Sequence, residues 1–218
     1  MSTRHGLALL SLICIPARLI AEDLVLGDWR LQGGLISTSY GAPAPQVSNG
    51  TGPSSSVIAR NAISNHRVEL QYQGGRMGAW GGPIYGAAVW YGQAKFVDSD
   101  HEDDLNTAGI DLDVGYGLAL SSAWHVEATV MAGAGRSQTE VFGSSDEERT
   151  RPAYEGGARI GAYWTGESGF QLGIAVPYLY NDTHSSYSYV GGDGTLDHVD
   201  EKRINRGFGV LVSAGLRW

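Results

Sequence analysis

The sequence contains very little cysteine and little proline. Its one cysteine, Cys14, lies near the N-terminus, so the rest of the chain can form neither disulfides nor a thiol-based active site. Only 7 of the 218 residues are proline, whereas 32 are glycine. The glycines do not indicate a disordered linker, because 42% of the residues are hydrophobic and 10% are aromatic. Since glycine inside a helix costs roughly 1 kcal/mol relative to alanine, we do not expect an all-helical chain.

Positive charge and long apolar runs are also scarce. Lysine and arginine total 15 against 23 aspartates and glutamates, a net charge of -8, which argues against a nucleic-acid partner. A transmembrane helix needs about 20 apolar residues, and the run from Leu7 to Ile15 is shorter. Because Arg4 precedes this run and Ala21 follows it, residues 1–21 are predicted to be a secretory signal peptide, with a mature domain over residues 22–218.

The mature domain alternates apolar residues with small or polar ones. In residues 110–120, IDLDVGYGLAL, every even position is large and apolar and every odd position is Asp, Gly or Ala. A period of two predicts a β-strand with two different faces. The same pattern predicts seven more strands, at 29–35, 68–72, 83–97, 124–134, 154–164, 170–180 and 204–218. Within 83–97 the faces are ambiguous, and we assign Trp90, Ala94 and Phe96 to the apolar face and Lys95 to the polar face.

The connections between these strands alternate in length. Short ones are predicted at 76–82, 121–123 and 166–168, and long polar ones at 41–65, 98–106, 141–151 and 182–200. An up-and-down arrangement places alternate connections at opposite ends. The sequence therefore predicts an all-β fold, an eight-stranded antiparallel up-and-down barrel.

The apolar face of the strands must meet either a dry core, as in a soluble barrel or sandwich, or lipid. The strands reach the 9–11 residues or so that a tilted bilayer crossing needs, beyond the soluble mode of about five to six. The opposite face is rich in small residues, which suits a crowded barrel interior. We therefore predict a transmembrane β-barrel, and aromatic residues at the strand ends should act as interfacial anchors. The anchors near the short turns are Trp124, Trp164, Phe170 and Trp218.

Three features of the sequence are typical of a known family. They are the signal segment, the alternating strands with asymmetric loops, and the final segment GFGVLVSAGLRW, which ends on an aromatic residue. Together they resemble the small eight-stranded outer-membrane barrels of Gram-negative bacteria, the OmpA-like and OmpX-like group. The resemblance is architectural and covers nearly the whole mature chain. It implies residence in the cell outer membrane as a monomer, recognition of the final segment by the barrel-insertion machinery, and contact with membrane lipid and lipopolysaccharide. Arg206 is a candidate to bind a phosphate group of lipopolysaccharide. The alternative is that its side chain only extends its charge to the membrane interface.

Charged residues on the polar face are expected to pair inside the barrel, because an isolated buried charge costs several kcal/mol. We expect a salt-bridged plug, since eight strands enclose little more than their own side chains; a polar channel is the alternative. His125 and Arg217 are further candidates for this network. Its predicted members are Arg30, Glu69, Lys95, Asp111, Asp113, Glu127, Glu155 and Arg159.

Two other patterns bear on chemistry. The acidic run 98–104 offers oxygens to a divalent cation, but it lacks the calcium-loop spacing, so we expect a solvated charge run and no metal or cofactor. His184 and Ser186 have a spacing similar to the His-x-Ser of outer-membrane lipid A deacylases, although Tyr187 stands where that family has Asn. We expect a non-enzymatic protein with a structural or surface-interaction role through its long loops, whose partner is not identified. A lipid A-modifying hydrolase and a small diffusion pore are the alternatives.

Overall fold

The computed structural model describes residues 24–41, 46–47, 64–78, 80–98, 101–141, 151–190 and 196–218. Their strands, in chain order, are β1 Leu24–Gly41, β2 Gln46–Val47, β3 Ser64–Met77, β4 Gly82–Asp98, β5 His101–Ala119, β6 Trp124–Val141, β7 Arg151–Thr165, β8 Phe170–Val190 and β9 Leu196–Arg217. No helix in these ranges is long and apolar enough to cross a membrane.

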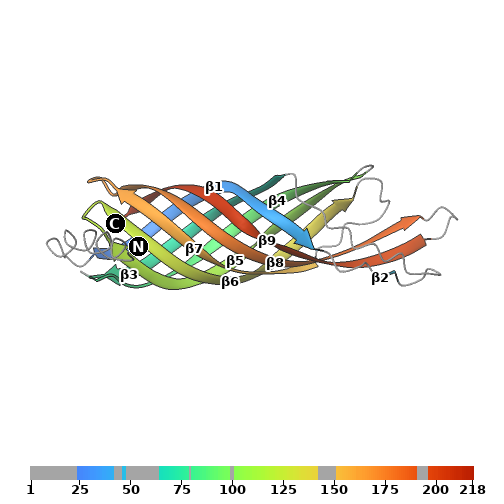
Figure 1. Ribbon diagram of the computed structural model, residues 1–218, viewed down its shortest axis with the longest axis horizontal. Helices are drawn as coiled ribbons and strands as arrows, with labels where there is room; N and C mark the ends of the chain where they lie inside the picture. The colour runs from blue at the N-terminus through green and yellow to red at the C-terminus, as the bar shows by residue number, and fades with distance from the viewer. Residues whose placement is uncertain are drawn as a thin grey trace, which may run out of the picture.

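The eight long strands form one closed barrel (Figure 1). Each pairs antiparallel with the next, and β1 pairs with β9, which removes the free edges of the sheet. Among the described strands, the two-residue strand β2 pairs with β9 alone. The predicted eight-stranded antiparallel barrel is therefore confirmed, and its strands are longer than the sequence pattern indicated.

Alternation along each strand separates two environments. Large apolar side chains point away from the barrel axis, and Leu31, Leu112 and Ile160 are 58%, 67% and 68% exposed. The residues between them point inward, and many are buried charged or amide side chains. Because a strand has a period of two, a single register sends every apolar residue of one parity outward.

The three short connections lie where they were predicted. They join β3 to β4, β5 to β6 and β7 to β8 at one end of the barrel, which is called the turn end below. Gly81 and Gly169 have φ angles of 86° and 80°, a left-handed conformation that glycine adopts without strain. The opposite end, where β1 finishes and β3 begins, is called the loop end.

The assignment of faces in β4 was wrong. Trp90 is 2% exposed and lies inside, where its Nε1–H donates a 2.8 Å hydrogen bond to Asp111 Oδ1. Its neighbours Val89 and Tyr91 point outward at 60% and 49% exposure. The physical reason is that a buried tryptophan needs a partner for its N–H, and the carboxylate on β5 supplies one. Lys95 therefore has the outward parity; it is half-buried, and its register partner is Asp104.

Two predicted long loops are largely strand. Residues 98 and 101–106 belong to β4 and β5, whose ladder continues to the pair Asp98↔His101. Residues 182–190 and 196–200 belong to β8 and β9, which pair as far as Val190↔Leu196. Polar composition suggested loops, whereas paired backbone groups make a hairpin that extends past the barrel (Figure 1).

Candidate functional site

The barrel interior holds a group of charged side chains at the turn end, here called the turn-end cluster. It consists of Asp28, Arg30, His125, Glu127, Gln171 and Arg217. Arg30 is fully buried, and its two terminal nitrogens reach the Glu127 carboxylate at 2.7 and 2.6 Å. Arg30 also donates to Asp28 Oδ2 at 2.9 Å and to Gln171 Oε1 at 2.8 Å. One guanidinium thus ties together β1, β6 and β8, three separate parts of the barrel wall.

A second guanidinium completes this cluster. Arg217 Nε donates to Asp28 Oδ1 at 2.9 Å, which links β9 to β1 where the barrel closes. His125 lies 3.0 Å from Glu127 Oε1 and stacks on Tyr163, with ring centroids 5.2 Å apart. The Arg30 guanidinium lies 3.9 Å from the centre of the same Tyr163 ring. The cluster is therefore packed as well as paired.

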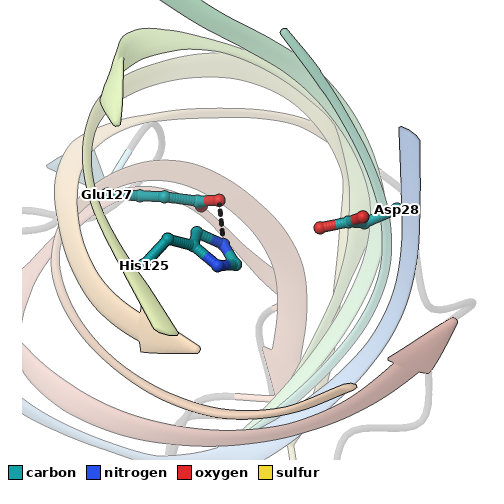
Figure 2. A group of neighbouring side chains, drawn as sticks. All are labelled: Asp28, His125 and Glu127. Carbon is teal, nitrogen blue, oxygen red and sulfur yellow. Dashed lines mark hydrogen bonds and ion pairs between the residues drawn. The ribbon is translucent and has the colours of Figure 1, made fainter. Parts of the chain in front are cut away.

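Asp28, His125 and Glu127 have the residue types of a metal centre, and their ligand atoms lie within 4.8 Å of one another. Figure 2 shows Glu127 hydrogen-bonded to His125, with Asp28 on the facing wall. However, Arg30 Nη2 lies 2.9 Å from Asp28 and 2.6 Å from Glu127, in the position that an ion between these carboxylates would take. Since Arg30 and Arg217 balance the two carboxylates in charge, the geometry favours a closed ionic seal over a metal site.

A second group lies further toward the loop end, and we call it the mid-barrel cluster. It consists of Arg67, Glu69, Asp111, Glu155 and Arg159. Arg67 pairs with Glu69 and Asp111 at 2.9 Å each and with Glu155 at 2.8 Å. Arg159 pairs with Glu69 at 2.7 Å. These five residues come from β3, β5 and β7, and each is at least nine-tenths buried.

Glutamine side chains separate the two clusters. Gln71 donates to Asp113 Oδ2 at 3.0 Å and to Gln73 Oε1 at 2.9 Å, and it accepts a hydrogen bond from Gln32. Asp113 is therefore held by an amide, and no guanidinium lies within ion-pair distance of it among the pairs in the described interior. These hydrogen bonds link side chains from β1, β3 and β5 across the interior between the two clusters.

A small cavity adjoins the mid-barrel cluster on its loop-end side. Arg67, Glu155 and Asn181 line it, and Asn181 donates a 3.2 Å hydrogen bond to Glu155. Asn205 is the register partner of Asn181 and lines the same space. The remaining lining residues are mainly small or apolar and comprise Ile36, Asn65, Gly92, Ala94, Leu105, Thr107 and Leu179. The cavity therefore combines buried charge, amide groups and an apolar wall.

Comparison with known proteins finds no matching family model and no matching curated relative. Solved structures that align with the chain include several outer-membrane β-barrels. Neisserial surface protein A is 11% identical over 87% of this chain and 97% of that one, with a TM-score of 0.42. AlkL, solved in lipid bilayers, is 17% identical over 88% and 90%, with a TM-score of 0.37. Ail of Yersinia pestis, in complex with the heparin analogue sucrose octasulfate, is 14% identical over 84% and 98%, with a TM-score of 0.33.

The chain folds as a small eight-stranded β-barrel. At these identities and TM-scores, nothing that the compared proteins bind or do transfers to this barrel.

The structure brings most of the predicted interior residues together. Arg30 and Glu127 lie in the turn-end cluster, as do His125 and Arg217. Glu69, Asp111, Glu155 and Arg159 lie in the mid-barrel cluster, and Asp113 lies between the two. Lys95 is not among them, because β4 has the opposite face inward.

Asp28 and Arg67 are two charged members of these clusters that the sequence pattern missed. Each lies one position before a strand that was predicted too short, and two positions before Arg30 and Glu69 respectively, so that it shares their inward parity. Extending each alternation by one inward position would have found both. Arg67 is the larger omission, because it holds three carboxylates.

The predicted anchors lie on the outer surface near the turn end. Trp124 and Trp164 are register partners, and Trp124 is 50% exposed. Phe170 lies opposite Leu216, while the Trp218 backbone N–H donates to Gly27 O at 3.4 Å.

His184 and Ser186 belong to β8, and their register partners on β9 are Lys202 and Asp200 respectively. Their side chains fall outside the described residues, as do the whole predicted signal segment, residues 1–21, and residues 99–100 of the acidic run.

Proposed function

We propose that this barrel is an integral protein of a bacterial outer membrane, with a structural or surface-interaction role and no catalytic machinery. The observation that carries the proposal is the continuous apolar exterior. Every long strand contributes exposed large hydrophobic side chains, including Val68, Val89, Ile174 and Val212. Soluble monomers rarely expose contiguous apolar patches above a few hundred Å², whereas a bilayer requires such a surface. The closed sheet also pairs the backbone groups that lipid could not satisfy.

The interior supports a sealed barrel over a diffusion pore. The turn-end cluster joins four strands through Arg30 and Arg217, and both guanidiniums are held by carboxylates. An ion that crossed this layer would have to break buried charge pairs, which costs several kcal/mol. The expected conductance is therefore close to that of an empty bilayer.

Lipid contact extends to lipopolysaccharide at the loop end. Arg136 and Arg206 are exposed on the outer surface beyond the apolar band, and Tyr180 is the register partner of Arg206. Guanidinium groups bind phosphate oxygens through paired hydrogen bonds, so these two arginines fit the phosphates of lipopolysaccharide. Because lipopolysaccharide lies on the outer side of the membrane, the loop end faces the outside of the cell in this proposal.

The surface-interaction role belongs to the loop end and its hairpin. Strands β8 and β9 continue their ladder past the barrel, and β2 pairs with β9 alongside. The hairpin sequence is rich in Tyr, Ser, His and Asp, residue types that supply aromatic and hydrogen-bonding contacts. Export by a signal peptide over residues 1–21, insertion by the barrel-insertion machinery and a monomeric state belong to the same proposal.

Two measurements test the proposal: the cell fraction in which the full chain is found, and whether the chain requires lipid or detergent to fold. Expressed in a Gram-negative host, the protein should sediment with the outer membrane and resist extraction by urea. Refolded from urea, it should recover β-structure in a maltoside detergent or in vesicles but not in plain buffer. A chain that folds and stays soluble in buffer would contradict the proposal.

A further inference from the structure

We propose that the cavity on the loop-end side of the mid-barrel cluster binds a small primary ammonium ion. The proposal goes beyond the structural role above, since it assigns a ligand to the barrel interior.

The first observation is an imbalance of charge. Within the mid-barrel cluster, two guanidiniums pair with the three carboxylates of Glu69, Asp111 and Glu155. Asp113 adds a further carboxylate nearby, held by Gln71. The turn-end cluster has no such excess, because its two carboxylates meet two guanidiniums. A buried negative charge without a counter-charge is costly, so the mid-barrel cluster must hold either a proton or a cation.

The second observation places the cation. Asn205 is 5% exposed and lines the cavity, and its Oδ1 has no hydrogen-bond partner within the described part of the chain. Asn181 Oδ1 lacks one too, and its register position is directly opposite. Buried acceptors of this kind are rare without a donor. Glu155 lines the same cavity, so three residues with acceptor oxygens, two of them amides and one a carboxylate, border one space.

The third observation selects the chemistry of the cation. A primary ammonium has three N–H donors, which match Asn181, Asn205 and Glu155. The rest of the wall includes Leu105 and Leu179, against which a short alkyl group can pack. A hydrated metal ion would gain nothing from this apolar wall. Arg67 is the one basic residue among the described lining residues, and its guanidinium is already engaged with three carboxylates.

Methylammonium is the probe, titrated into the full chain in a maltoside detergent, which carries no ammonium group. Side-chain amide NMR signals of Asn181 and Asn205 should shift saturably. Asn205→Ala should weaken binding roughly tenfold, and Glu155→Gln roughly a hundredfold, as expected for hydrogen bonds to a charged group and for loss of the counter-charge. Asn106→Ala is the matched control, because Asn106 hydrogen-bonds Tyr91 on the outer face, and it should leave binding unchanged. Circular dichroism verifies that each variant folds.

Competing cations separate the outcomes. Tetramethylammonium has no N–H, so it should neither bind nor compete. Equal binding of potassium would overturn the assignment to an ammonium group. A methylammonium titration without saturation, together with a carbon-13 signal of a protonated Glu155 at neutral pH, would overturn the site altogether, because a proton would then remove the excess charge.

Discussion

Replacement of Arg30 by methionine tests whether the turn-end cluster seals and stabilises the barrel. The substitution keeps much of the side-chain volume and removes the guanidinium that serves Glu127, Asp28 and Gln171. Breaking a buried ion pair by deleting one partner typically costs about 3–5 kcal/mol, since the remaining charge stays buried and uncompensated. Asp28 keeps Arg217 as a partner, so Glu127 carries most of the loss. We expect a loss of about 4 kcal/mol in the free energy of unfolding.

Urea unfolding in lipid vesicles, followed by tryptophan fluorescence, measures this loss. With an m-value near 2 kcal/mol/M, the midpoint should fall by about 2 M. Arg136→Met removes an arginine from the outer surface and should change stability by less than about 0.5 kcal/mol in lipid without lipopolysaccharide.

A double variant gives the decisive comparison. Arg30→Met with Glu127→Gln removes the stranded charge along with its partner, so it should be more stable than Arg30→Met alone. If the two losses simply add, the charge of Glu127 is not what Arg30 compensates, and the reasoning about the seal is refuted.

Four further outcomes follow from the same geometry. Leu112→Arg should cost about 2–4 kcal/mol in vesicles, as expected for an arginine facing the lipid midplane, while Leu112→Phe should be nearly neutral; equal effects would contradict an outward Leu112. Brominated lipid should quench Trp124 but not Trp90, so Trp124→Phe should reduce total quenching and Trp90→Phe should leave it unchanged. Gly169→Ala should cost about 1–3 kcal/mol in urea unfolding, because its φ of 80° strains any other residue. Ser186→Ala should leave the acyl chains of lipopolysaccharide unchanged by mass spectrometry, and a chain lost only with Ser186 present would establish the hydrolase instead.

The barrel was predictable because lipid imposes the simplest pattern on a strand. An exterior that must be apolar and an interior that must be small or polar give a period of two, and residues 110–120 show it without exception. The short turns were found for a related reason, since each interrupts that alternation with glycine or serine.

The misassigned strand shows where the pattern stops being informative. In β4 both parities carry apolar residues, and Trp90 looks like a lipid-facing residue when only its hydrophobicity is considered. Its true face depends on Asp111, which lies 21 residues away and becomes its partner only through the β4–β5 register. The prediction of loops at 98–106 and 182–200 was wrong for a similar reason. Beyond the bilayer a paired strand no longer needs an apolar face, so its sequence need not alternate.

The pairing of charges inside the barrel could likewise not be predicted from the sequence, because the register of the whole closed sheet determines which charged residues meet. Arg30 and Glu127 are 97 positions apart, and Arg67 and Glu155 are 88 apart. What the sequence does contain is the inward parity of each residue, and from this the presence of an ionic interior follows.

The two clusters differ in a way that separates stability from binding. The turn-end cluster is balanced in charge, with hydrogen bonds between side chains from four strands, so its removal should loosen the barrel without creating a binding site. The mid-barrel cluster has more carboxylates than guanidiniums, and it adjoins a cavity bordered by two amides whose oxygens lack a hydrogen-bond partner among the described residues. A barrel whose only requirement was to stay closed would gain from balancing both. The excess of carboxylates in the mid-barrel cluster therefore distinguishes a layer that accepts a cation from the layer at the turn end that seals the interior, and Arg30→Met should leave methylammonium affinity unchanged while it lowers stability.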